Sequence, residues 1–245
     1  MNALPQTCAE LARLIDHTLL KPETSAAQID RLCDECRQYA FYAACVNPVW
    51  VERCVRRLAG SRSIVASVAG FPLGASLPAT KADEARRAVE QGAAEVDMVA
   101  NIGALVAGDR DSVVRDIEAV VAAVVRANSR ALVKVILETA ALTEPQIILG
   151  CRCAAEAQAD FVKTSTGFHP AGGATVEHVT LLKRHAGPLK VKAAGGIRDL
   201  QTALALLEAG ADRLGLSAGV KVVEEMDALR AGASQDSRPG GRDRR

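Results

Sequence analysis

Two lysines near the ends of apolar segments are the residues of this chain best suited to chemistry. Lys163 lies in the segment 161–167 (FVKTSTG), and Lys192 lies in the segment 189–196 (LKVKAAGG). Burial is costly for a charged lysine, because desolvation disfavours the ammonium form. Two lysines in consecutive strand-like segments therefore predict a neutral amine nucleophile, which the second ammonium group keeps neutral.

Such an amine would form a Schiff base with a carbonyl compound. An ordinary lysine has a pKa of about 10.4, so only about 0.04% of it is neutral at pH 7. Lowering the pKa to roughly 7–8 raises the reactive fraction by roughly two to three orders of magnitude. A dry pocket and a neighbouring ammonium group can supply that shift.

Strand alternation predicts two further charged side chains beside these lysines. Asp97 lies in the segment 95–99 (EVDMV) and Lys134 in the segment 132–137 (LVKVIL), each at a position that can face inward. The predicted cluster comprises Asp97, Lys134, Lys163 and Lys192. Its carboxylate fits a proton shuttle. The alternative is a structural ion network that fills a barrel interior.

Short apolar segments alternate with amphipathic ones along the whole chain. The predicted strands are residues 14–19, 43–46, 64–69, 95–99, 132–137, 160–165, 189–193 and 213–216. The predicted helices are residues 25–39, 48–58, 77–91, 109–126, 144–157, 175–185, 199–208 and 218–229. Eight strands alternating with eight helices predict an α/β fold of the (β/α)8 TIM barrel type. A doubly wound open sheet is the alternative, weakened because no G-x-G-x-x-G follows the first strand.

Glycines after the sixth, seventh and eighth strands suggest a phosphate site. Gly195 and Gly196 follow the seventh strand, Ser217 follows the eighth, and Gly167 follows the sixth. In such barrels these loops commonly bind phosphate through backbone N–H groups and a helix N-terminus. The alternative is that these glycines only form tight turns.

Composition narrows the class of protein. The 245 residues carry a formal net charge of +1 and only 3% aromatic residues, which gives no support for binding nucleic acid or a membrane surface. No apolar run approaches the roughly 18 residues of a spanning helix, and no secretory signal is visible. We expect a cytoplasmic enzyme with one barrel domain at residues 1–230 and a disordered polar tail at 231–245.

The cysteines and histidines show no metal-ligand spacing. Seven cysteines without a signal peptide indicate reduced thiols. The C-x-x-C of Cys33 and Cys36 falls in a helical pattern, so a zinc or redox site is the less favoured interpretation. Cys45 falls near a strand end, where its thiol could be reactive. Of the four histidines, His17 could line the pocket.

Five motifs together resemble the deoxyribose-phosphate aldolase family, from about residue 14 to residue 220. The motifs are 14–22 (LIDHTLLKP), 95–99 (EVDMV), 134–139 (KVILET), 162–168 (VKTSTGF) and 191–198 (VKAAGGIR). The resemblance implies a class I aldolase that interconverts 2-deoxyribose 5-phosphate with glyceraldehyde 3-phosphate and acetaldehyde. It implies that Lys163 forms the Schiff base, that Lys192 perturbs it and takes part in proton transfer, and that Asp97 is the acid/base partner.

The resemblance also implies pocket residues and partners. Asp16, Thr18 and Lys134 would line the pocket, and the partners would be phosphosugar and aldehyde substrates, with a possible homo-oligomer. No metal or cofactor is expected, because the iminium is already the electron sink. Two other functions remain open: a different Schiff-base barrel such as a transaldolase-like enzyme, and a phosphosugar-binding barrel without turnover.

Overall fold

Eight parallel strands close into a barrel in the computed structural model, which describes residues 4–236 of the chain. Each strand pairs with the next one in sequence, and β8 pairs with β1 to close the ring. The strands are β1 (Ile15–Leu19), β2 (Ala43–Val46), β3 (Ile64–Ala69), β4 (Glu95–Val99), β5 (Leu132–Ile136), β6 (Phe161–Lys163), β7 (Lys190–Ala194) and β8 (Arg213–Leu216). The (β/α)8 prediction is confirmed, and the open-sheet alternative is wrong.

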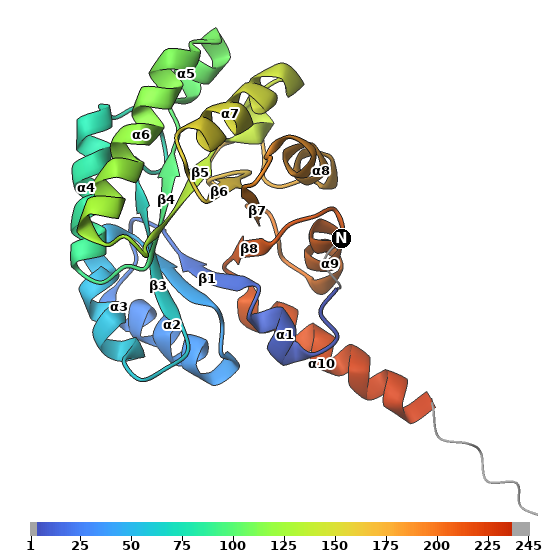
Figure 1. Ribbon diagram of the computed structural model, residues 1–245. Coiled ribbons are helices and arrows are strands. Elements are labelled where there is room, and N and C mark those ends of the chain that lie inside the picture. The colour runs from blue at the N-terminus through green and yellow to red at the C-terminus, as the bar shows by residue number, and fades with distance from the viewer. Residues whose placement is uncertain (1–3, 237–245) are drawn as a thin grey trace, which may run out of the picture.

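Helices cover the outside of the barrel (Figure 1). They are α1 (Cys8–Ala12), α2 (Ala26–Tyr39), α3 (Val51–Leu58), α4 (Pro78–Glu90), α5 (Ile102–Ala107), α6 (Arg110–Ala127), α7 (Glu144–Glu156), α8 (Val176–His185), α9 (Leu200–Glu208) and α10 (Gly219–Asp236). Two 3-10 turns, η1 (Pro48–Trp50) and η2 (Thr139–Ala141), follow β2 and β5. All eight predicted helices are present, although the one expected at 48–58 begins as η1 and continues as α3.

Periodicity does not predict the short helices α1 and α5, because neither is long enough to repeat an apolar face. A capping box starts α1: the Thr7 hydroxyl accepts from the Glu10 N–H at 3.1 Å, and the Glu10 carboxylate accepts from the Thr7 N–H at 3.1 Å. This Thr-x-x-Glu spacing is a sequence signal that could have found the helix. In α5, the Asn101 side chain caps the first turn.

The last helix is longer than expected. It continues to Asp236, beyond the predicted end at residue 229, and α1 packs against it; the disorder predicted for 231–245 stays a prediction. Extending an existing helix costs less than starting one, which explains how a polar segment joins α10. The rest of the predicted tail, 237–245, lies outside the described residues.

Strand register places the charged residues inside the barrel. Asp97 pairs with Lys134 across β4 and β5, and Lys163 pairs with Lys192 across β6 and β7. The alternate positions of these strands are apolar and pack beneath the helices, as with Val96, Met98, Val133, Val135, Val162 and Val191. The period of two therefore sends apolar side chains outward and ionic ones inward.

Strand β6 ends at Lys163, earlier than the predicted end at residue 165. The reason lies in Thr164, whose hydroxyl donates to the Ala194 carbonyl at 3.1 Å and accepts from the Ala194 N–H at 3.0 Å. A side chain thus replaces the backbone ladder directly after Lys163. These two hydrogen bonds hold the end of β6, which bears Lys163, against β7.

Candidate active site

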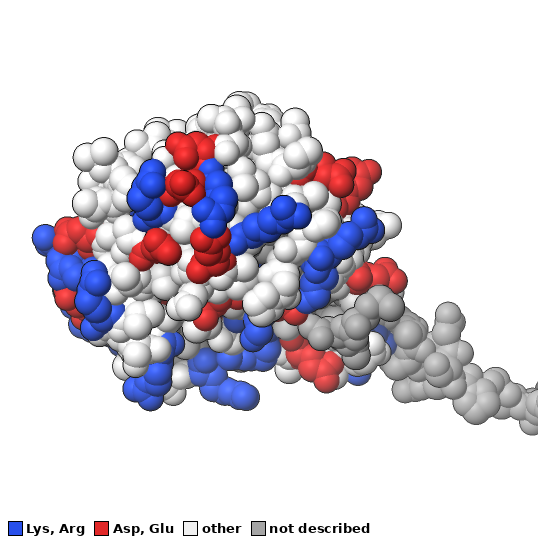
Figure 2. Space-filling view, turned by 45° about the horizontal axis from the view of Figure 1, so that its top comes forward, with Lys and Arg blue, Asp and Glu red and all other residues white. Residues whose placement is uncertain are grey.

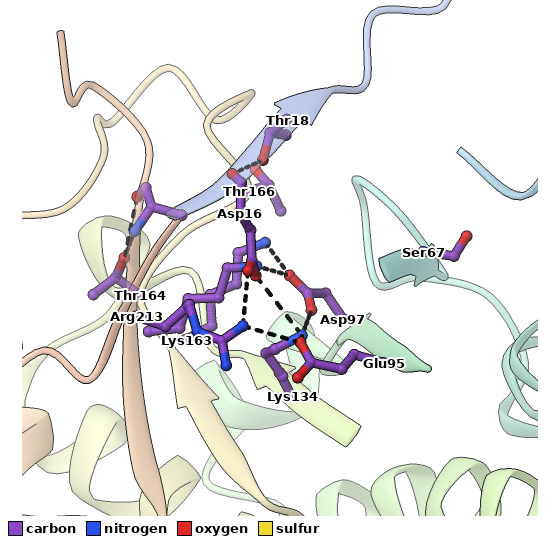
Figure 3. Close-up of polar contacts among 12 residues, drawn as sticks. Asp16, Thr18, Ser67, Glu95, Asp97, Lys134, Lys163, Thr164, Thr166 and Arg213 are labelled. Carbon is purple, nitrogen blue, oxygen red and sulfur yellow. Dashed lines mark hydrogen bonds and ion pairs between the residues drawn. The ribbon is translucent and has the colours of Figure 1, made fainter. Parts of the chain in front are cut away.

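Asp97 is the centre of the ionic cluster inside the barrel (Figure 3). One of its oxygens, Oδ2, accepts from Lys163 Nζ and from Lys192 Nζ, each at 2.7 Å. The other, Oδ1, accepts from Lys134 Nζ at 2.7 Å. The four residues predicted to form a cluster are therefore in direct contact.

The cluster extends toward the N-terminal end of the barrel through two residues that sequence reasoning missed, Glu95 and Arg213. Glu95 Oε2 lies 2.6 Å from Lys134 Nζ and 3.3 Å from Arg213. Arg213 also donates to Asp16 Oδ1 at 2.8 Å, and Asp16 Oδ2 accepts from Lys192. The same strand alternation could have found both residues, because each starts a strand on the inward face.

Burial and neighbouring charge act in opposite directions on these groups. Burial lowers the pKa of Lys163 and the Lys192 ammonium lowers it further, although the Asp97 carboxylate acts the other way. Burial also disfavours charge on Lys192, but Asp16 and Asp97 outweigh it and raise the pKa of Lys192 above its ordinary value. Burial works against ionisation of Asp97, yet three lysines hold its pKa well below the usual range. Lys163 is thus the amine of the cluster most easily deprotonated.

The charge balance of the cluster also favours a neutral Lys163. Fully ionised, the cluster has four cations and three anions, namely Lys134, Lys163, Lys192 and Arg213 with Asp16, Glu95 and Asp97. An excess positive charge in a buried site is unfavourable. Loss of one proton from Lys163 removes this excess and leaves three buried ion pairs.

A cavity of about 360 Å³ opens above Lys163 at the C-terminal end of the strands. Its lining includes six of the predicted site residues: Thr18, Lys163, Gly167, Gly195, Gly196 and Ser217. The other four, Asp16, Asp97, Lys134 and Lys192, are fully buried beneath it and are not among the lining residues. Asp16 and Lys134 belong to the ionic cluster, so this cavity does not confirm the prediction that they line the pocket. Lys21 and Arg198 also line the cavity, which the sequence did not indicate.

The glycine at position 195 allows two loops of the cavity to meet. Gly195 has a φ of +89°, and a Cβ there would lie 3.1 Å from the Cα atoms of both Gly167 and Gly173. Its carbonyl accepts from the Ala174 N–H at 3.0 Å. The glycines therefore do form tight turns, and these turns converge on the same cavity as the lysine.

A buried carboxylate holds the loop after β6, and sequence reasoning gave it no such role. Glu138 has a left-handed backbone (φ 60°, ψ 57°) and accepts from the Thr166 hydroxyl at 2.5 Å. That hydroxyl accepts in turn from the Phe168 N–H at 3.1 Å. Phe168 lines the cavity and meets Phe71, from the loop after β3, edge to face at 5.3 Å.

His17 does not line the cavity, contrary to expectation. Its neighbours Asp16 and Thr18 face the barrel interior, so alternation sends the His17 ring outward. There it lies 2.7 Å from Glu35 on α2 and packs on Phe41 at 4.7 Å. Burial lowers the pKa of His17, although Glu35 acts against the shift.

The cysteines give no sign of a metal or redox site. All seven are free, and within residues 4–236 no group of His, Cys, Asp and Glu is arranged to hold a metal ion. Cys45 is fully buried, and burial raises the pKa of its thiol. The expectation of a reactive Cys45 at the strand mouth is therefore not supported, because its reactive thiolate form is disfavoured.

One face of the molecule carries side chains of both charges (Figure 2). Acidic and basic side chains meet in several clusters on this face, between larger uncharged areas. Within the described residues, no helix combines the length and apolar character needed to cross a bilayer. This agrees with the near-zero net charge.

Comparisons with known proteins place the chain in a family. The DeoC/LacD family aldolase model matches residues 11–225. A deoxyribose-phosphate aldolase of Geobacillus sp. (strain WCH70) is 53% identical over 215 residues, which are 87% of this chain and 95% of that protein. Deoxyribose-phosphate aldolase 1 of Bacillus licheniformis is 52% identical over 89% of this chain and 97% of its own length.

A solved structure agrees. The deoxyribose phosphate aldolase of Aeropyrum pernix, described as tetrameric, superposes with a TM-score of 0.83 at 34% identity, covering 91% of this chain and 93% of that one. With family model, sequence relatives and fold in agreement, the chain belongs to the DeoC/LacD family of aldolases.

Proposed function

We propose that the protein is a class I aldolase that reversibly cleaves 2-deoxy-D-ribose 5-phosphate to D-glyceraldehyde 3-phosphate and acetaldehyde. The observation that carries the proposal is Lys163 itself, a buried amine with a lowered pKa, beneath a cavity and 2.7 Å from Asp97. The relatives named deoxyribose-phosphate aldolase supply the substrate. The proposal needs neither metal nor cofactor, because an iminium withdraws electrons from the neighbouring carbon.

The reaction would use the hydrogen bonds of the cluster for proton movement. Neutral Lys163 Nζ attacks the substrate carbonyl, and the carbinolamine loses water to give an iminium. Lys192, whose pKa is raised, is the ammonium that can donate a proton to the leaving hydroxyl. Asp97 bridges Lys163 and Lys192 and so connects the donor to the reacting nitrogen. Removal of the C3 hydroxyl proton along this route breaks the C2–C3 bond and leaves D-glyceraldehyde 3-phosphate and an enamine on Lys163. Return of that proton to the enamine carbon gives the iminium of acetaldehyde, and water then hydrolyses it to acetaldehyde and the free Lys163 amine.

The substrate phosphate would bind beside the glycine loops that line the same cavity. Gly195, Gly196 and Ser217 are among its lining residues, and their backbone N–H groups and the start of α10 can receive an anion. Arg198 and Lys21 add positive charge to the lining. When Lys163 becomes an iminium, it carries a positive charge again. The negative charge of the substrate phosphate would partly offset it.

The decisive experiment traps the Schiff base. Borohydride reduction in the presence of acetaldehyde should add an ethyl group to Lys163, detected by peptide mass spectrometry. A Lys163→Met variant should show no such adduct. Adducts at Lys134 or Lys192 with Lys163 unmodified would overturn the assignment, and no adduct at all would favour a phosphosugar-binding barrel. Trapping only with other donors would favour a different Schiff-base aldolase.

The same proposal includes a cytoplasmic location and a homo-oligomer. Seven unpaired cysteines suit a reducing compartment. The Aeropyrum pernix relative is described as a tetramer, which supports self-association without fixing the number of subunits here. Light scattering of the purified chain measures that number.

A further inference from the structure

The ionic cluster continues from Lys163 to the opposite end of the barrel. From Asp97 it passes through Lys134 to Glu95 and Arg213, as Figure 3 shows. The Arg213 guanidinium lies 3.3 Å from the centre of the Tyr42 ring, which covers it at this end. Glu95 and Arg213 are almost completely buried. Neither lines the cavity, so neither can touch the substrate.

Most strands of the barrel present a charged or titratable side chain to the interior around Lys163. The charged or titratable groups that face the interior are Asp16 from β1, Cys45 from β2, Glu95 and Asp97 from β4, Lys134 from β5, Lys192 from β7 and Arg213 from β8. At the N-terminal end of the barrel, Tyr42 packs on Arg213, and the exposed Lys190 lies over the Phe161 ring. Strand β3 (IVASVA) contributes no charged residue, and β6 contributes Lys163 itself. Among the described residues that line the cavity, Lys21 and Arg198 are the charged side chains besides Lys163.

We propose that Glu95 and Arg213 are positioning residues that control, from the far end of the barrel, how readily Lys163 takes up a proton. The inference rests on the proposed role of Lys163 as nucleophile. Glu95 and Arg213 are the anion and the cation nearest the N-terminal end of a buried ionic network that has one cation more than it has anions. Removing either charge changes the balance that favours neutral Lys163, and the two changes have opposite signs.

A purely structural pair would not behave in this way. In a low-dielectric interior a unit charge acts over a long distance: across roughly 10 Å, at an effective dielectric constant of about 20, it shifts a pKa by about one unit. One carboxylate oxygen of Glu95, Oε1, is buried and has no hydrogen-bond partner, so hydrogen bonds to the surrounding structure do not account for the whole carboxylate. We therefore expect Glu95 to act mainly through the attraction of its negative charge for Lys134 and Arg213.

The test measures protonation of Lys163 without relying on turnover. Brief acetylation with acetic anhydride at a series of pH values, followed by mass spectrometry of the Lys163 peptide, gives the midpoint of its reactivity. Glu95→Gln removes an anion and should lower the midpoint by about one pH unit. Arg213→Met removes a cation and should raise it by a similar amount.

Two controls separate charge from packing. The double variant Glu95→Gln/Arg213→Met restores the balance, so its midpoint should return toward that of the parent, and Arg213→Lys should stay near the parent. Lys190 is a matched control, because its Nζ lies 5.7 Å from the Phe161 ring centre, as the Arg213 guanidinium does, but it is exposed to solvent. Lys190→Met should move the midpoint little, because water screens that charge.

Midpoints that move in the same direction in both single variants, or a folded Glu95→Gln protein with an unchanged midpoint, would overturn the proposal. If Arg213→Met does not fold, the comparison of Glu95→Gln with the double variant and with Arg213→Lys still decides it. Failure of the aldolase assignment is distinguishable. It would appear as absence of the acetaldehyde adduct on Lys163, whereas the acetylation midpoints can be measured in either case.

Discussion

Two buried lysines of this protein have similar hydrogen bonds and very different surroundings. Lys81, between α4 and α6, donates to Asp116 at 2.8 Å and to the Val99 carbonyl at 2.8 Å. Lys163 donates to Asp97 at 2.7 Å. Burial lowers the pKa of both lysines, and in both cases the carboxylate acts against the shift.

The difference lies in the carboxylates and in access. Burial raises the pKa of Asp116, and Lys81 only partly compensates, so this pair is an isolated bridge between helices. Asp97 is shared by three lysines that keep it ionised. Lys163 lines a cavity, whereas Lys81 is fully buried and its side chain packs against Gly70. A lowered pKa thus indicates a nucleophile only where surplus positive charge and an open cavity accompany it.

The largest expected effect follows removal of the amine at the cavity. Lys163→Met should reduce kcat/KM for 2-deoxyribose 5-phosphate by about 10⁴-fold or more, about 5.5 kcal/mol of transition-state stabilisation. Stability should be kept, because the remaining cluster has three cations and three anions. Turnover assays beside thermal unfolding measure both. If the Lys163→Met protein kept turnover near the parent level, Lys163 would not be the nucleophile and would not differ from Lys81 in function.

Removal of the Lys81 amine should reduce stability and leave turnover unchanged. Lys81→Met leaves the buried Asp116 without its cation and should cost about 3–5 kcal/mol of unfolding free energy. Turnover per folded molecule should stay near that of the parent. Urea denaturation measures the loss, and the double variant Lys81→Met/Asp116→Leu should recover much of it. A stable Lys81→Met protein that has lost turnover would show that Lys81 also serves the reaction.

Sequence reasoning predicted one of these lysines and not the other. Lys163 lies on a strand, where a period of two and a following glycine loop show which way it faces. Lys81 lies on a helix whose sequence, PATKADEARRAVE, reads as a solvated charged surface. Its burial depends on the packing of α4 against α6, which no local pattern in either helix reveals.

The cluster itself shows the same limit. Alternation predicted the inward faces of Asp97, Lys134, Lys163 and Lys192, but it could not show that Arg213 closes the far end. That depends on barrel closure, which brings β8 beside β1 and Arg213 to Asp16. The left-handed Glu138 was likewise hidden, because its role depends on a loop 28 residues later in the chain.

The pH dependence of turnover tests whether the charge of Lys192 sets the protonation of Lys163. Replacing Lys192 with leucine removes a cation beside Lys163, so the pKa of Lys163 should rise. Since the neutral amine is the reactive form, the acidic limb of kcat/KM should move to higher pH, with a loss of about 10²-fold at neutral pH. Stopped assays across pH 5–10 measure the limb.

Asp97→Asn is the control of opposite sign. It removes an anion from Lys163, so any residual acidic limb should move to lower pH while turnover falls about 10²-fold or more. If both variants leave the limb in place, charge does not set the nucleophile's protonation. The special surroundings of Lys163 would then be structural, as they are for Lys81.

The smallest expected effect is at Ser217, which lines the cavity but belongs to neither lysine–carboxylate pair. Ser217→Asp places a carboxylate against the substrate phosphate, repelling it and competing for the N–H donors at the start of α10. It should lower kcat/KM for 2-deoxyribose 5-phosphate by at least about tenfold, about 1.4 kcal/mol. Unphosphorylated 2-deoxyribose should be much less affected, because it has no dianion to repel, and Ser217→Ala should lose little with either substrate. A parallel fall for both sugars would mean that the phosphate is not held there and that the carboxylate acts on Lys163 through the cavity.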